Sequence, residues 1–210
     1  MGSVESRCNL FHLASQVIEF GVPGDFVEVG CNAGESSVVL QKVMQTLDPT
    51  RKLYLFDSFE GTPDPDVRDE GAYSKGDMTA SQNEVLSNFK TMGLPLPEIH
   101  PGWFDDTLPK GLPNRIAFSL IDGDLYSSTM TALQNVYPRL VPHSVCILAV
   151  YCDPKVFTPL TTSLKYRSPG VKKACDEFFA DKPEKVSVLF SGHYTAGYFR
   201  KKSVSASCSL

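Results

Sequence analysis

Short apolar runs alternate with amphipathic segments along most of the chain. Runs that are rich in β-branched and aromatic residues, and that glycine, proline or aspartate bounds, predict buried strands of a parallel sheet. Segments whose apolar residues recur at spacings of three and four predict helices packed on that sheet. The predicted strands are residues 26–29, 52–56, 97–100, 115–121 and 144–150, and the predicted helices are residues 10–20, 38–47, 82–92, 127–140 and 168–180. This alternation predicts an α/β protein with helices on both faces of the sheet.

Two further strands are predicted near the end of the chain, at residues 185–190 and 196–200, as an antiparallel hairpin. With them the sheet has seven strands, mostly parallel, in a Rossmann-like arrangement. Neither an internal repeat nor a linker divides residues 1–200, so we expect a single domain. Residues 201–210 are mostly small and polar, and we expect them to form a disordered tail.

The first predicted strand leads into a glycine-containing turn and then a helix, reading GDFVEVGCNAGESSVVL from Gly24. This order of elements brings backbone close to a nucleotide and directs helix N–H groups at it. The spacing Gly30-x-x-x-Gly34 lacks the three glycines of a dinucleotide fingerprint. Glu28, at the end of the strand, suits a ligand that presents a cation or hydroxyl groups. The alternative is an ordinary strand–turn–helix unit of another doubly wound fold.

Acidic and aromatic residues follow three other predicted strands, at the edge of the sheet where ligands bind in such folds. Asp57 ends the second strand, 23 residues after Gly34, near the spacing of about 20 at which an acidic residue meets ribose hydroxyls. The alternative for Asp57 is a helix N-cap. Trp103 follows the third strand and either flanks an adenine ring or fills the core. Asp122 and Asp124 follow the fourth strand with one glycine between them, and they are placed for chemistry.

A polar, acidic segment separates the second strand from the next helix, over residues 58–76. A loop of this length in a compact domain is usually a functional lid or disordered. After the fourth strand, Ser127 or Ser128 is expected to cap the following helix.

Composition limits the function classes. The formal net charge is −4, with 42% hydrophobic and 21% charged residues, as in a soluble globular protein. The lysines and arginines are scattered and leave no nucleic-acid footprint, and no apolar run reaches the roughly 18 residues of a membrane span. The six cysteines occur singly, so neither a zinc site nor a redox pair is indicated. With no secretory signal in the sequence, these features predict a cytoplasmic protein.

Six sequence blocks in a fixed order resemble one known family. They read GVPGDFVEVG, LYLFDSFEGTP, GWFDDTLP, IDGDLYSST, ALQNVYPRL and GYFRK, and they extend over residues 20–200. They are similar to the macrocin O-methyltransferase family of class I S-adenosylmethionine (AdoMet)-dependent methyltransferases. The resemblance implies the class I methyltransferase fold and methylation of a hydroxyl group on a sugar or a similar part of a natural product. It also implies a divalent metal beside the cofactor.

The resemblance implies roles for residues within these blocks. Glu28 and the glycine turn would hold the methionine end of AdoMet, and Asp57 would bind the ribose. Asp122 would be a metal ligand next to the cofactor. Taken with the reasoning above, the predicted cofactor-binding residues are Glu28, Gly30, Asn32, Gly34, Asp57, Ser58, Phe59, Trp103 and Asp122.

One departure from the family affects the metal. Where the family carries two acidic residues before a tyrosine, at the end of the fifth strand, this chain has Ala149-Val150-Tyr151. Methyl side chains cannot coordinate a hard cation, which requires oxygen ligands. We therefore expect the Mg²⁺ site to be empty or weakly occupied, with Asp122 and Asp153 as the ligands if any are used.

Without a tightly bound metal, side chains must orient or deprotonate the acceptor hydroxyl. We take Asp122, Asp124, Tyr151 and His193 as the catalytic candidates. For His193 the alternative is an exposed residue of a hairpin turn.

The sequence thus predicts an AdoMet-dependent O-methyltransferase, of the EC 2.1.1 type, that acts on a hydroxyl of a small-molecule natural product and can work without a metal. The alternative is a methyltransferase-fold protein that has lost methylation and serves as a binding protein or catalyses another biosynthetic reaction. Its partner would be a small-molecule acceptor, with no nucleic acid and no membrane, and homodimerisation is left open.

Overall fold

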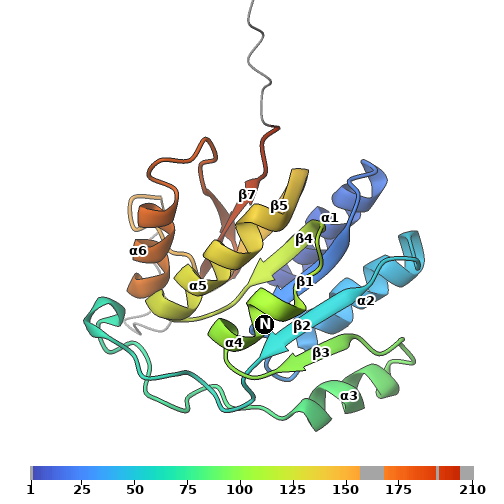
Figure 1. Ribbon diagram of the computed structural model, residues 1–210, viewed down its shortest axis with the longest axis horizontal. Coiled ribbons are helices and arrows are strands. Elements are labelled where there is room, and N and C mark those ends of the chain that lie inside the picture. The colour runs from blue at the N-terminus through green and yellow to red at the C-terminus, as the bar shows by residue number, and fades with distance from the viewer. Residues whose placement is uncertain (1, 157–167, 193, 204–210) are drawn as a thin grey trace, which may run out of the picture.

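A seven-stranded sheet with the order β3-β2-β1-β4-β5-β7-β6 forms the centre of the computed structural model (Figure 1). The structure describes residues 2–156, 168–192 and 194–203. The strands are β1 (Asp25–Val29), β2 (Leu53–Asp57), β3 (Glu98–Pro101), β4 (Ile116–Ile121), β5 (Leu140–Leu148), β6 (Ser187–Phe190) and β7 (Thr195–Arg200). Strands β1 to β5 are parallel, whereas β7 pairs antiparallel with both β5 and β6. The predicted mostly parallel sheet with a C-terminal antiparallel hairpin is confirmed.

Helices cover both faces of this sheet (Figure 1). They are α1 (Val4–Glu19), α2 (Glu35–Leu47), α3 (Gln82–Thr91), α4 (Phe104–Gly111), α5 (Tyr126–Val136) and α6 (Pro169–Phe178). Buried side chains of α1, α2 and α3 form one hydrophobic cluster with the sheet, and those of α4, α5 and α6 form a second cluster on the other face. None of the helices within the described ranges is both long enough and apolar enough to cross a membrane.

Side chains alternate between the two faces along each strand, and β1 shows the pattern most clearly. Phe26 packs in the first cluster, where its ring stacks on Phe118 with centroids 5.1 Å apart. Val27 and Val29 pack in the second cluster. Glu28 therefore points to the same face of the sheet as Phe26, toward α2.

Helix α1 begins at Val4 rather than at residue 10, because Ser3 caps it by accepting a hydrogen bond from the Ser6 N–H at 3.0 Å. The apolar pattern also does not predict α4, whose Pro109 and terminal glycine are typical of a loop. The negative charges of Asp105 and Asp106, in its first turn, interact favourably with the positive end of the helix dipole.

The predicted serine caps of α5 are wrong. Leu125 is the N-cap residue, without a side-chain hydrogen bond, and Ser127 and Ser128 lie inside the first turn. The helix ends at Val136, and a 3₁₀ turn over Tyr137–Arg139 leads directly into β5. The strand therefore begins four residues earlier than the apolar run predicts.

The chain stays hydrogen-bonded beyond residue 200, where we predicted a tail. The Lys201 N–H donates to the Ser144 carbonyl at 2.9 Å, and the Lys202 N–H donates to Glu184 Oε1 at 3.0 Å. The predicted tail boundary at residue 201 is thus too early, and residues 204–210 lie outside the described ranges.

Residues 58–80, which we call the acidic loop, adopt a hydrogen-bonded fold (Figure 1, teal). Backbone bonds join its two arms, from the Thr62 N–H to the Asp77 carbonyl at 2.8 Å and from the Gly76 N–H to the Thr62 carbonyl at 2.9 Å. Asp69 is 1% exposed, and its carboxylate accepts from the Tyr126 N–H at 2.8 Å. The loop is therefore fastened to the start of α5.

We expect Asp69→Ala to lower the free energy of unfolding by about 1–3 kcal/mol, because the buried Tyr126 N–H loses its acceptor. Asp64→Ala is the matched control, since the Asp64 side chain is 76% exposed and pairs only with Lys75 at the surface. Urea denaturation measures both variants, and hydrogen exchange should show faster exchange in the acidic loop of Asp69→Ala alone. Equal losses in the two variants would contradict the fastening role.

Candidate functional site

The turn between β1 and α2 lies against the end of β4. Gly30 has φ +87°, and a Cβ there would lie 2.1 Å from the Asp122 carbonyl oxygen. The Asp122 N–H donates to the Val29 carbonyl at 2.8 Å, which holds the two strand ends together. Glycine is required at position 30 because a larger residue meets both a positive φ and a backbone collision. The glycine turn and the carboxylates after β4 are thus brought side by side.

Asn32 joins this turn to β2 and to the acidic loop. Its N–H donates to Asp57 Oδ2 at 2.8 Å, and its side-chain amide donates to the Met78 carbonyl at 2.5 Å. The other oxygen of Asp57 accepts from the Phe59 N–H at 2.8 Å. Both oxygens of the Asp57 carboxylate are therefore held by backbone donors, and the group is fixed in place.

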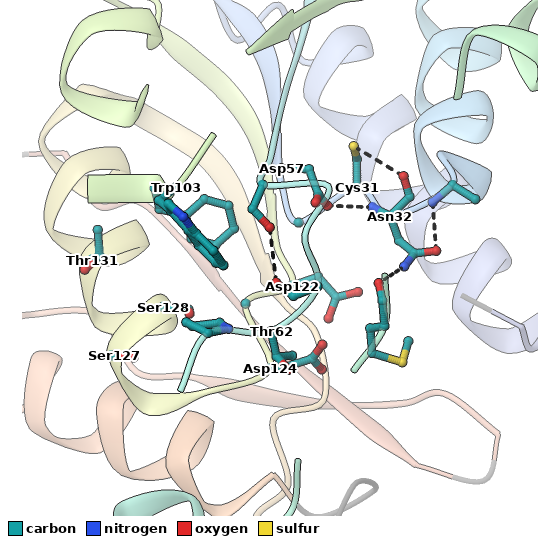
Figure 2. A pocket seen from close by; sticks show the side chains of 18 of the residues that line it. Cys31, Asn32, Asp57, Thr62, Trp103, Asp122, Asp124, Ser127, Ser128 and Thr131 are labelled. Carbon is teal, nitrogen blue, oxygen red and sulfur yellow. Dashed lines mark hydrogen bonds between the residues drawn. The ribbon is translucent and has the colours of Figure 1, made fainter. Parts of the chain in front are cut away.

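A cavity of about 510 Å³, the first cavity, opens between the glycine turn, β2, α4 and α5. In Figure 2 the Trp103 ring and Asn32 border it on two sides, with Asp57 and Asp122 between them in the view. Seven of the predicted site residues line it, namely Gly30, Asn32, Asp57, Ser58, Trp103, Asp122 and Asp124. The structure thus brings together most of the predicted cofactor-binding residues.

Glu28 lies beneath the glycine turn and does not line the first cavity. It is 0% exposed, and its two carboxylate oxygens accept hydrogen bonds from the hydroxyls of Ser36 and Ser37 in α2. Burial raises the pKa of Glu28 to about 7, although the serine bonds act in the opposite direction. The predicted role of Glu28 in holding the methionine end of AdoMet stays a prediction. Glu28 anchors the first turn of α2, and Gly34 and Phe59 also lie off the lining.

Asp122 and Asp124 form a carboxylate pair at the end of β4. Asp124 has φ +59°, which is uncommon outside glycine, and its Oδ1 accepts from the Tyr73 hydroxyl at 2.8 Å. Surrounding protein raises the pKa of Asp122 well above the ordinary aspartate value, and the nearby charge of Asp124 adds to this effect. A carboxylate with a raised pKa is a stronger base than an ordinary one.

A second cavity of about 360 Å³ adjoins the first. The two share Gly2, Met78, Asp122 and Asp124 in their linings. The carboxylate pair therefore borders both cavities. A group in one cavity and a group in the other could both approach the pair.

Two predicted catalytic or metal-binding residues, Tyr151 and Asp153, are not brought to this place. Tyr151 is buried in the cluster on the other face of the sheet and lines neither cavity. Asp153 also lines neither cavity, and its Oδ1 accepts from the Lys155 N–H at 3.0 Å. Asp153, which was named with Asp122 as a ligand only if a metal were used, therefore does not share a cavity with Asp122 in the structure. His193 lies outside the described residues.

The described side chains around Asp122 do not provide the oxygen ligands that a divalent cation requires. Among the described side chains, no three of His, Cys, Asp or Glu gather so that they could hold a metal ion. At the end of β5, Ala149 and Val150 line the second cavity and offer only carbon atoms. Val150 has φ +50°, an outlier for a β-branched residue.

Tyr73 and Met78 are site residues that sequence reasoning missed. Both come from the acidic loop, and Met78 lies between the two cavities. The length of the loop indicated a lid, but nothing in the local sequence shows that Tyr73 reaches Asp124, a residue 51 positions later.

The strand order, the glycine turn and the carboxylate pair after β4 define a class I methyltransferase fold. The chain belongs to the macrocin O-methyltransferase family, whose model, described as Macrocin-O-methyltransferase (TylF), matches residues 5–166.

Two relatives and one solved structure show the extent of the similarity. The chain is 37% identical over 154 residues to 8-demethyl-8-(2,3-dimethoxy-alpha-L-rhamnosyl)-tetracenomycin-C 4'-O-methyltransferase of Streptomyces olivaceus, covering 68% of this chain and 59% of the relative. It is 32% identical over 158 residues to mycinamicin III 3''-O-methyltransferase of Micromonospora griseorubida, covering 70% and 62%. The O-methyltransferase NovP superposes with a TM-score of 0.78 at 26% identity, covering 95% of this chain and 81% of NovP. The match spans about three fifths of the length of the curated relatives.

The buried Glu28 predicts a pH dependence of stability. Its folded-state pKa of about 7 lies above the ordinary value of 4.5, so the folded protein holds this proton more tightly than the unfolded chain does. The resulting stabilisation is complete below about pH 4.5 and is lost as the pH rises through about 7. A shift of this size corresponds to about 3 kcal/mol.

Glu28→Gln removes the titration and keeps the shape of the side chain. We expect the variant to gain free energy of unfolding relative to the wild type between pH 4.5 and pH 8, with Glu19→Gln, exposed at the end of α1, as the control for loss of a charge. Chemical denaturation at several pH values measures the difference. A constant difference between wild type and Glu28→Gln across this range would show that folding does not raise the pKa of Glu28.

Proposed function

We propose that the protein is an AdoMet-dependent O-methyltransferase that methylates a hydroxyl group of a small-molecule natural product in the cytoplasm. The observation that carries the proposal is the position of Asp122 and Asp124 at the junction of two cavities. One cavity would hold a methyl donor and the other an acceptor, and the carboxylates lie where they meet. The named activities of the two curated relatives favour this over a protein without methyltransferase activity.

The first cavity fits AdoMet in its chemistry. The glycine turn allows close approach of a ligand to backbone, because a side chain at Gly30 would fill the space. The fixed Asp57 carboxylate would accept hydrogen bonds from the ribose hydroxyls, and Trp103 offers an aromatic surface for the adenine. AdoMet supplies a methyl group on a sulfonium, which is already a good leaving group.

Asp122 is the residue that we assign as the general base. It would accept the proton of the acceptor hydroxyl, and the methyl group replaces that proton on the oxygen. The raised pKa of Asp122 is closer to the pKa of a hydroxyl group than the pKa of an ordinary carboxylate is, which favours proton transfer from the acceptor. Asp124, held by Tyr73, orients the pair and keeps a negative charge beside Asp122.

Cys8, Cys31, Cys146 and Cys175 are free thiols, which is in keeping with a reducing compartment. The proposed cytoplasmic location rests on these free thiols and on the fact that the cysteines occur singly in the sequence, without a Cys-x-x-Cys pair.

We expect Asp57→Asn to weaken binding of S-adenosylhomocysteine by about 10- to 100-fold, because one oxygen becomes an amide that cannot accept from a backbone N–H or a hydroxyl. Asp25→Asn, at the opposite end of β1, is the matched control, since Asp25 accepts from the Lys52 N–H away from both cavities. Isothermal titration calorimetry measures both. Unchanged affinity in Asp57→Asn would remove the ribose site from Asp57.

Methyl transfer should persist in EDTA, because the described residues around Asp122 do not include a group of three that could hold a metal ion. Asp122→Asn should lower the turnover rate by about 100- to 10,000-fold, as expected for loss of a general base. In the wild type the rate should rise with pH through a value above the ordinary aspartate pKa, because Asp122 acts in its deprotonated form. Activity that EDTA abolishes and Mg²⁺ restores would overturn the metal-free assignment.

A further inference from the structure

The second cavity has an apolar floor built from both ends of the chain. Its apolar lining comes from α1, β4, the end of β5 and the C-terminal hairpin, and consists of Leu10, Leu120, Ile147, Ala149, Val150, Leu189 and Ala196. Ala149 is held beside β4, because its N–H donates to the Ile121 carbonyl at 2.9 Å. Its methyl group therefore has a fixed place in the floor.

The rim of the second cavity is polar but uncharged. The Ser6 hydroxyl and the Tyr194 hydroxyl are 3.1 Å apart, and the Asn9 amide donates to the Phe190 carbonyl at 2.7 Å. These bonds tie α1 to the C-terminal hairpin across the cavity. The rim is thus preorganised by hydrogen bonds within the protein.

The charge of this lining is one-sided. Among the described residues that line the second cavity, Asp122 and Asp124 are the only carboxylic acids, and no lysine, arginine or histidine is present. A phosphate in a protein site is normally held by arginine, lysine or several backbone donors. A phosphate placed here would meet two carboxylates instead, and like charges at short range repel.

We propose that the second cavity is the acceptor site, and that the acceptor is an uncharged, phosphate-free molecule whose one or two apolar rings lie on the floor while its hydroxyl faces Asp122 and Asp124. The inference rests on the proposed function and names its substrate class. A volume of about 360 Å³ is near the lower end of small-molecule sites, which span roughly 300–1,000 Å³. Nucleotide-linked sugars are excluded by their phosphates, whereas the hydroxyl can belong to the ring system itself or to a neutral sugar attached to it.

Three matched probes separate these sources, namely 2-naphthol, 2-naphthyl β-D-glucoside and 2-naphthyl phosphate. Calorimetry with protein loaded with S-adenosylhomocysteine measures their binding. We expect 2-naphthol, the glucoside or both to bind, and the phosphate to bind at least about tenfold more weakly than the better of them. Binding of the phosphate as tightly as 2-naphthol, or no binding of either neutral probe, overturns the proposal.

Leu189→Trp tests whether the neutral probes occupy this cavity, because the larger side chain fills part of it. Ser187→Trp is the matched control, since residue 187 lies two positions earlier in β6, on the same face, and outside the second cavity. We expect Leu189→Trp to weaken probe binding about tenfold or more and Ser187→Trp to leave it unchanged. Ala149→Leu places a larger side chain in the same cavity, next to the end of β5. It provides a second test of probe binding if Leu189→Trp folds poorly.

The same titrations keep this inference apart from the proposed function. Failure of the wild type to bind S-adenosylhomocysteine would refute the proposed function itself. Normal binding of S-adenosylhomocysteine, together with neutral probes that both cavity-filling variants bind as well as the wild type does, refutes only the acceptor site.

Discussion

The close contact between the ends of β1 and β4 is the constraint on which the site depends. The Asp122 N–H bonds to the Val29 carbonyl, and the Asp122 carbonyl occupies the space in which a side chain at residue 30 would lie. One consequence is a backbone surface at the glycine turn that a ligand can approach closely. The other is that the Asp122 side chain emerges beside this surface. The glycine turn and the Asp122 side chain are therefore positioned by a single backbone contact.

The acidic loop completes the site by binding to three separate elements. It contacts the glycine turn through Met78 and Asn32, the end of β4 through Tyr73 and Asp124, and the start of α5 through Asp69. These contacts join residues far apart in the sequence, so the position of the loop depends on the sheet and on α5. Its position closes the side of both cavities that the sheet leaves open.

The strand pattern predicts the sheet well because buried parallel strands require continuous apolar runs, and the acids that follow β2 and β4 end up at the same edge. Asp57 and Asp122 accordingly both line the first cavity. Glu28 is predicted to hold the methionine end of AdoMet, and strand alternation turns its side chain toward α2, where the hydroxyls of Ser36 and Ser37 donate hydrogen bonds to it. Tyr151 lies on the opposite face from Ala149, because β5 ends at Leu148 and the left-handed backbone at Val150 interrupts the alternation that would put both residues on one face. The local sequence pattern also does not predict α4, because Pro109 is typical of a loop. It does not predict the contact of Tyr73 with Asp124 either, because the two residues are distant in sequence.

The left-handed backbone at Val150 bears on how this site could be redesigned. A β-branched residue is strained in that conformation, whereas aspartate and asparagine adopt it more readily. The backbone at the end of β5 is thus already shaped for an acidic side chain, although the residue there is apolar. A third carboxylate beside Asp122 and Asp124 would repel them unless a cation were bound. An acidic residue introduced at position 150 would therefore relieve the backbone strain but add repulsion between carboxylates. The folding stability of the redesigned protein would then depend on divalent cations.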